Sequence, residues 1–99
     1  MTDFELFITD FGQSKVLEPG LMNFPYPCTR FFRAPELCLG SHKYGLSADI
    51  WSVGCIIFEL FTKTPLFPGD LNSTQLLEMT SVKGSPTQSE LIELSKIIN

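Results

Sequence analysis

The sequence predicts a mainly α fold with a short N-terminal β-strand, a long loop and three to four helices. Two observations carry this prediction. Apolar residues recur around helical turns in the second half of the chain, whereas prolines and glycines interrupt much of the first third. The hydrophobic share of 43%, which includes nine Phe, excludes a disordered chain as a whole.

The first third of the chain is predicted to be extended or irregular. Residues 4–9 are rich in Phe, Leu and Ile, and they are expected to form a short buried strand that leads into Asp10. Residues 13–33 hold several prolines and show no helical period, which indicates a long loop. One turn of helix is expected next, with Pro35 at its first position and Gly40 closing it.

Three longer helical segments are predicted in the remainder. The first covers residues 47–62, with Ser47 as its N-cap, Asp49 in the favourable first turn and Pro65 as the stop signal. The second runs from about residue 73 to residue 82. The third begins near Thr87, where Glu90 three residues later completes a capping-box pattern, and an apolar stripe extends to Ile98.

The first long helix is unusually apolar. Nine of the twelve residues in 50–61 are apolar, and they cover nearly the whole circumference of a helix. Such a helix either spans a membrane or lies at the centre of a large domain. Because a span needs about 20 residues, the second reading is favoured. A 99-residue chain has few elements to surround this helix, so the sequence looks like part of something larger.

Four short motifs occur in a fixed order along the chain. Asp-Phe-Gly at 10–12 is followed by Cys-Thr-Arg-Phe-Phe-Arg at 28–33, Ala-Pro-Glu at 34–36 and Asp-Ile-Trp-Ser-Val-Gly-Cys at 49–55. The ends of the two tripeptides lie 26 positions apart (36 − 10). This order and spacing resembles the activation segment of a protein kinase.

The resemblance is closest to the CMGC group of serine/threonine kinases, and most of all to the glycogen synthase kinase 3 family. The shared features are the length of the segment, Arg-Ala-Pro-Glu-Leu at 33–37, Phe-Pro-Gly-Asp at 67–70 and Gly-Ser-Pro-Thr at 84–87. The fold implied is a partial protein-kinase C-lobe that is an incomplete domain over residues 1–99. Its expected parts are a strand and Asp-Phe-Gly motif (1–12), an activation segment (13–36), a central buried helix (47–62) and following helices (73–98).

The resemblance assigns roles to the first motif and to Thr29. Asp10 would hold the Mg²⁺ that bridges the ATP phosphates, although an Asp can also simply cap a turn. Phe11 would pack inward and report the active or inactive state, and Gly12 would give the hinge its backbone freedom. Thr29 resembles the hydroxyl that bonds the catalytic Asp of kinases; the alternative is a solvated loop threonine.

The resemblance also implies two phosphate sites. Arg30 and Arg33 match the pair that receives an activation-loop phosphate, and Tyr26 stands at the position of the phosphotyrosine. Tyr26 could instead only pack, because prolines flank it and the one after it departs from the family pattern. Lys15 matches one of three cations that bind a substrate primed by phosphorylation; the alternative is an exposed lysine.

Three further residues are assigned structural roles by the resemblance. Glu36 resembles a carboxylate that pairs with an arginine of the later C-lobe. Asp49 resembles the helix-start carboxylate that accepts hydrogen bonds from the catalytic loop, and Trp51 belongs to the same motif. The partners of Glu36 and Asp49 would lie outside this chain, so both carboxylates are expected to stay solvated or to protonate.

Several kinase elements are missing from the 99 residues: there is no Gly-x-Gly, no Val-Ala-Ile-Lys and no His-Arg-Asp. The family implies ATP and Mg²⁺ as cofactors of a complete domain and protein substrates, some of them primed by phosphorylation. The fragment alone is expected to bind neither cofactor and to be inactive. Two alternatives remain open: a scaffold-binding, pseudokinase-like module that docks helices at Val82 to Ile98, and an incomplete gene product without function.

Composition limits the partners and the compartment. The net charge of −4 argues against non-specific nucleic-acid binding, and no apolar run approaches the length of a membrane span. Cys28, Cys38 and Cys55 show no Cys-x-x-Cys spacing and are expected to be buried thiols. Together with an acidic N-terminus, these features predict an intracellular protein of the cytoplasm or nucleus.

Overall fold

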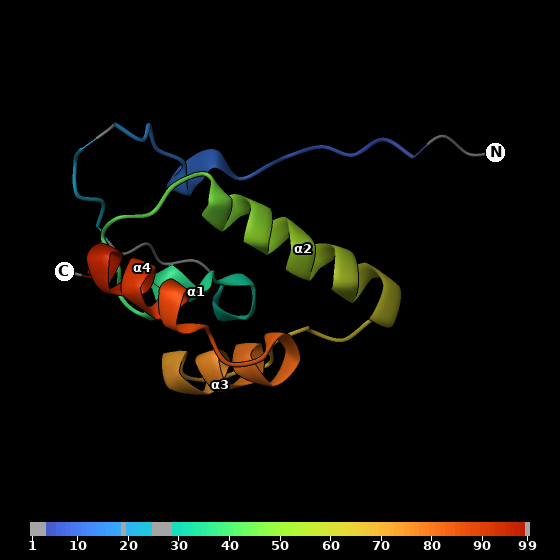
Figure 1. The fold of residues 1–99 in the computed structure, drawn as a ribbon. Helices are drawn as coiled ribbons and strands as arrows, with labels where there is room; N and C mark the ends of the chain where they lie inside the picture. Colours follow the sequence, from blue (N-terminus) through green and yellow to red (C-terminus); the bar gives the residue numbers. More distant parts are fainter. Residues whose placement is uncertain (1–3, 19, 25–28, 99) are drawn as a thin grey trace.

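The computed structural model describes residues 4–18, 20–24 and 29–98, and this part of the chain is mainly helical, as predicted (Figure 1). Two short 3-10 turns come first, η1 (Phe11–Gln13) and η2 (Arg30–Phe32). The four α-helices that follow are α1 (Pro35–Cys38), α2 (Ser47–Thr62), α3 (Asn72–Lys83) and α4 (Gln88–Ile98). Helices α3 and α4 both pack against α1. The η2 turn, which precedes all four helices in the chain, contacts both α2 and α3.

The predicted N-terminal strand is wrong. Residues 4–9 have no regular secondary structure, and their apolar side chains are exposed, Phe4 to 95% of its full area. Strand backbone groups need a neighbouring strand as hydrogen-bond partner, and no other described segment forms one. The segment therefore runs away from the helices in Figure 1.

The single turn of helix α1 forms as predicted. Pro35 occupies the first position, and the chain leaves the helix through Gly40, whose φ is 77°. The Ser41 N–H donates to the Glu36 carbonyl at 2.9 Å, and the Gly40 N–H donates to the Leu37 carbonyl at 3.2 Å. These two bonds make a Schellman motif, which satisfies carbonyls that a helix end leaves without partners.

Helix α2 has the predicted bounds but not the predicted cap. Ser47 is its first helical residue, because Leu46 before it is already in the right-handed helical region (φ −60°, ψ −19°). At the other end Lys63 takes a left-handed conformation (φ 62°), and its N–H donates to the Glu59 carbonyl at 2.8 Å. The helix therefore ends at Thr62, three residues before Pro65.

The core joins α1, α2, α3 and the loop between α2 and α3. Its buried members are Cys38, Cys55, Phe67 and Met79. Trp51 stacks on Phe67 with ring centroids 5.6 Å apart and an interplanar angle of 17°. The two described cysteines are buried thiols, as predicted, and burial raises the pKa of the Cys55 thiol. Cys28 lies outside the described residues.

Helix α2 is buried along one face only, so the predicted central buried helix is wrong in that respect. Ala48 and Cys55 face the core, whereas Ile50 is 71% exposed and Phe61 is 86% exposed. The other described elements cover a single side of α2. An apolar circumference with cover on one side leaves a large hydrophobic surface in water, which agrees with a sequence built for a larger domain.

Helix α4 begins with the predicted capping box. The Thr87 N–H donates to Glu90 Oε2 at 2.7 Å, and the Glu90 N–H donates back to Thr87 Oγ1 at 3.3 Å. The Thr87 hydroxyl also contacts Oε2 at 2.7 Å. These bonds favour the charged carboxylate and lower the pKa of Glu90.

This capping box predicts an acid-sensitive helix. Because the pKa of Glu90 is lower in the folded state, its contribution to the stability of α4 is present at neutral pH and lost as pH falls through the folded pKa. We expect the protection factors of the α4 amides, which correct for the intrinsic pH dependence of exchange, to fall over that range. Glu90→Gln keeps an acceptor but removes the charge, so it should flatten the pH profile, whereas Glu93→Gln on the same helix should not. Identical profiles for Glu90→Gln and the unaltered chain would show that the cap does not titrate.

None of the helices in the described part of the chain is long and apolar enough to cross a membrane.

Candidate functional site

The Asp-Phe-Gly tripeptide lies at the end of the exposed N-terminal segment. Asp10 adopts a left-handed conformation (φ 62°, ψ 65°) just before η1, and its side chain makes no capping hydrogen bond to that turn. The left-handed backbone conformation in this tripeptide is therefore adopted by Asp10 and not by Gly12, which has no positive φ. The Asp10 carboxylate is open to solvent. It is thus available to bind a cation, and it makes no capping hydrogen bond to η1 that would fix its orientation.

Phe11 does not pack inward, so this expectation is wrong. Its side chain is 66% exposed, and every described residue from Phe4 to Val16 is exposed as well. An aromatic ring is buried only when other elements close over it. No described element covers η1 in this chain, which explains the exposure.

Arg30 and Arg33 connect the η2 region to the start of α3. The Nη1 group of Arg30 donates to the carbonyl of Asp70. The Nη1 group of Arg33 donates to Asn72 Oδ1 at 2.8 Å. The structure therefore brings both predicted phosphate-binding arginines to one place, beside two residues that the sequence analysis did not single out. Tyr26, the expected phosphorylation site, lies outside the described residues.

Thr29 immediately precedes η2, and its exposed side chain makes no capping hydrogen bond to that turn. Helix α2 holds the η2 turn in place, because the Ser52 hydroxyl donates to the Phe32 carbonyl at 2.8 Å. Because its side chain is exposed, the Thr29 hydroxyl can reach a group outside the described residues.

Lys15 lies against Tyr44, a residue that the sequence analysis missed. The Lys15 Nζ atom is 4.6 Å from the ring centroid, within the range of a cation–π contact. The Tyr44 hydroxyl donates to the Phe24 carbonyl at 3.0 Å, and the Asn23 N–H donates to the His42 carbonyl at 2.7 Å. The loop after η1 is therefore held against residues 42–44.

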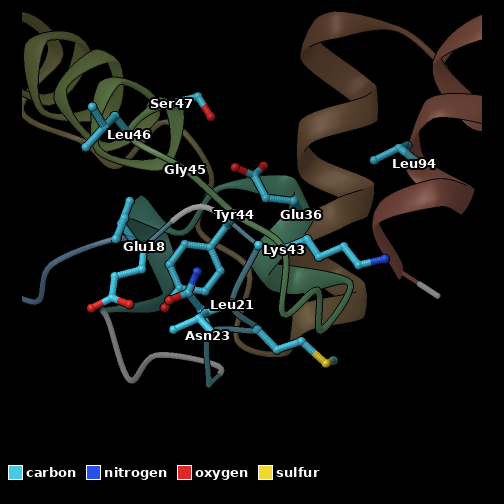
Figure 2. A pocket seen from close by; sticks show the side chains of 13 residues that line it. Glu18, Leu21, Asn23, Glu36, Lys43, Tyr44, Gly45, Leu46, Ser47 and Leu94 are labelled. Atoms are coloured by element: carbon cyan, nitrogen blue, oxygen red, sulfur yellow. The ribbon is translucent and has the colours of Figure 1, made fainter.

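A cavity of about 780 Å³ lies between this loop, α1 and α4 (Figure 2). Glu36 of α1 and Leu94 of α4 line it, together with Lys43 and Tyr44. Glu36 is only partly exposed, and the structure shows no ion pair for it within the described residues. The cavity can therefore admit a side chain or ligand beside a half-buried carboxylate.

Asp49 and Trp51 lie in the first turns of α2 on different sides. Asp49 is exposed, as a carboxylate without a buried partner must be. Trp51 is half-buried, and besides its stack on Phe67 it has the Lys83 Nζ atom 5.4 Å from its ring centroid. Its Nε1 atom is buried without a hydrogen-bond partner in the described part of the chain.

The motifs, their spacing and the helical fold can be compared with known families. A family model described as the protein kinase domain matches residues 1–97. The chain belongs to the protein kinase family. In this member of the family, Arg30 and Arg33 contact residues at the start of α3.

Protein kinases generally use ATP and Mg²⁺. The residues of this chain do not by themselves form a binding site for ATP and Mg²⁺. Across residues 4–18, 20–24 and 29–98, no group of three or more His, Cys, Asp or Glu side chains could hold a metal ion. The sequence also has no Gly-x-Gly, the pattern with which kinases cover the ATP phosphates.

Proposed function

We propose that this chain is the activation-segment and central C-lobe part of a serine/threonine kinase of the CMGC group, most similar to the glycogen synthase kinase 3 family. The complete domain transfers the γ-phosphate of ATP to Ser or Thr of intracellular proteins, near a proline or a priming phosphate. The observation that carries the proposal is the spacing of the motifs at 10–12 and 34–36, with Arg30 and Arg33 between them.

Asp10 is proposed as the Mg²⁺ ligand and Thr29 as the hydroxyl that bonds the catalytic Asp of the complete domain. Both side chains are exposed on the described surface, which supports contacts to groups outside this chain. The family supplies the ATP-binding lysine, the Gly-rich loop and the general base from other segments. The isolated 99 residues are therefore proposed to be inactive.

Phosphorylation of Tyr26 is proposed to order the activation segment through Arg30 and Arg33. Arg30 now donates to a neutral backbone carbonyl, and Arg33 donates to a neutral amide of Asn72. A phosphate of charge near −2 forms stronger, bidentate contacts with guanidinium than these acceptors do. Such a phosphate would draw both arginines away from the start of α3.

Glu36 and Asp49 are proposed to pair with parts of a longer kinase domain. The cavity beside Glu36 supports this role, because it leaves room for a cationic side chain next to a partly buried carboxylate. The exposure of Asp49 supports contacts with backbone N–H groups of the catalytic loop, which this sequence does not contain.

A transplanted segment tests the proposed specificity. Residues 10–92 would replace the corresponding segment of an active kinase of the glycogen synthase kinase 3 family. The hybrid is expected to phosphorylate Ser or Thr.

If Lys15 binds the priming phosphate, Lys15→Ala raises KM for primed peptides and spares unprimed ones, whereas Lys43→Ala changes neither. Phosphotyrosine in the product, or equal effects on both peptides, would contradict the assignment.

A second candidate function is docking of a scaffold helix at Val82 to Ile98. Val82, Leu91 and Ile92 are each more than half exposed. A second cavity of about 720 Å³ lies between α3, α4 and the loop that joins them. A predominantly apolar groove between two helices is a common receptor for an amphipathic helix.

A further inference from the structure

Two residues with a side-chain hydroxyl stand directly before a proline, Thr64 before Pro65 and Ser85 before Pro86. Serine or threonine followed by proline is the acceptor pattern of proline-directed protein kinases, and the proline biases the residue before it toward an extended backbone. Both hydroxyl residues are exposed. Exposure therefore does not distinguish them as phosphate acceptors, but their contacts do.

Thr64 is held in a compact turn after the end of α2. Its N–H donates to the Thr62 hydroxyl at 3.3 Å, and its own hydroxyl lies 3.3 Å from the same oxygen. Three residues later, Phe67 is buried in the core and stacks on Trp51. Entry of Thr64 into the cleft of a modifying enzyme in an extended form would break these bonds and pull on Phe67. The fold therefore protects Thr64 from modification.

Ser85 lies in the short loop that joins α3 to α4 (Figure 1). All the loop residues, 84–87, are exposed, and no hydrogen bond within the described residues involves Ser85. Gly84 before it has open space on the side where a Cβ would stand. Enzymes act most readily on exposed loop segments of a folded chain that make few contacts. Ser85 can therefore enter an active-site cleft without disturbing the core.

We propose that Ser85 is a phosphorylation site, modified by a separate proline-directed serine/threonine kinase. The Ser85 hydroxyl oxygen attacks the γ-phosphorus of ATP, the bond from that phosphorus to the bridging oxygen breaks, and ADP leaves. The hydroxyl proton passes to the general base of the modifying kinase. Because that kinase is a different molecule, the proposal does not depend on the activity proposed above for the complete domain of this chain.

Lys83 is the cation placed to receive the phosphate. It is separated from Ser85 by one residue, and both residues line the cavity between α3 and α4. Its Nζ atom lies 5.4 Å from the centroid of the Trp51 ring in the unmodified chain. A phosphate with a charge of about −2 attracts an ammonium group more strongly than the face of an indole ring does. Phosphorylation would therefore draw Lys83 away from Trp51 and add negative charge to the rim of this cavity.

Phosphorylation of the full 99-residue chain by a purified proline-directed kinase with Mg-ATP, followed by mass spectrometry, tests the site. Synthetic peptides of residues 60–69 and 81–90 correct for the sequence preference of that kinase. After this correction, Ser85 should be labelled at least about tenfold faster than Thr64, because Thr64 must first open from its turn. Ser85→Ala should lose the main label, and Thr64→Ala should keep it. Equal corrected rates at the two residues, or no label on Ser85, would overturn the proposal.

Trp51 fluorescence tests the partner of the phosphate, because Trp51 is the single tryptophan of the chain. We expect its emission to change when Ser85 is phosphorylated, since the Lys83 ammonium leaves the ring. Lys83→Gln should abolish this change, whereas Lys96→Gln on α4 should retain it. An unchanged emission after complete phosphorylation, or a change that persists in Lys83→Gln, would show that Lys83 does not receive the phosphate.

Discussion

Replacing Gly69 with Ala is expected to unfold the core that joins α1, α2 and α3. A Cβ at residue 69 would lie 2.3 Å from the Gln75 backbone nitrogen and 2.4 Å from its Cα, far inside van der Waals contact. Gln75 is fully buried, and its Oε1 atom accepts the Gly69 N–H at 2.9 Å. The clash is with helix backbone, so α3 must shift as a unit. We expect a cost of about 3 kcal/mol, at the upper end of overpacking.

Thermal unfolding followed by Trp51 fluorescence measures this effect, because Trp51 stacks on Phe67 in the same loop as Gly69. Gly45→Ala is the matched control, since its Cβ would meet nothing within 4 Å. The Gly69 variant should lose its transition or melt far earlier, while the control melts like the unaltered chain. Equal melting of both variants would mean that α3 is not held by this contact.

Removing the carboxylate of Asp10 is expected to abolish phosphoryl transfer in the hybrid kinase that carries residues 10–92. In the complete domain the exposed Asp10 carboxylate would hold Mg²⁺, which would neutralise charge on the ATP phosphates during transfer. We expect Asp10→Ala to lower kcat by roughly a thousandfold, in the range that such electrostatic groups supply.

Initial rates at saturating ATP and peptide provide the measurement for Asp10→Ala. Glu18→Ala, a change to another exposed carboxylate of the same loop, is the control and should retain the rate. Retention of more than a tenth of the activity by Asp10→Ala would exclude a metal-binding role for this residue.

Elements with local signals were predictable from the sequence. Pro35 marks the start of α1 and Gly40 follows its end, and the capping box of Thr87 and Glu90 marks the start of α4. These signals are local because capping depends on residues within one turn of the helix. The bounds of α2 are also as predicted. Its N-cap was misplaced by one residue, since the Leu46 backbone angles are set by the loop before it.

Features that depend on distant partners were not predictable. The strand at residues 4–9 and the packing of Phe11 need neighbours that the described chain does not provide. Arg30 and Arg33 find acceptors 40 and 39 residues away, at the start of α3, and no local pattern points to them. The close contact between Gly69 and Gln75 could not be predicted for a different reason. A glycine within Phe-Pro-Gly-Asp predicts a turn, and this pattern does not indicate which residue packs against it.

Transfer of radiolabelled phosphate from Mg-ATP to a primed peptide by the isolated 99-residue chain tests the central claim most directly. The sequence has Asp10 but no phosphate-covering Gly-x-Gly, no ATP lysine motif and no His-Arg-Asp, so the chain should transfer nothing above the background without protein. Transfer above that background, lost in Asp10→Ala, would contradict the account, because it would show that these 99 residues hold a complete catalytic site.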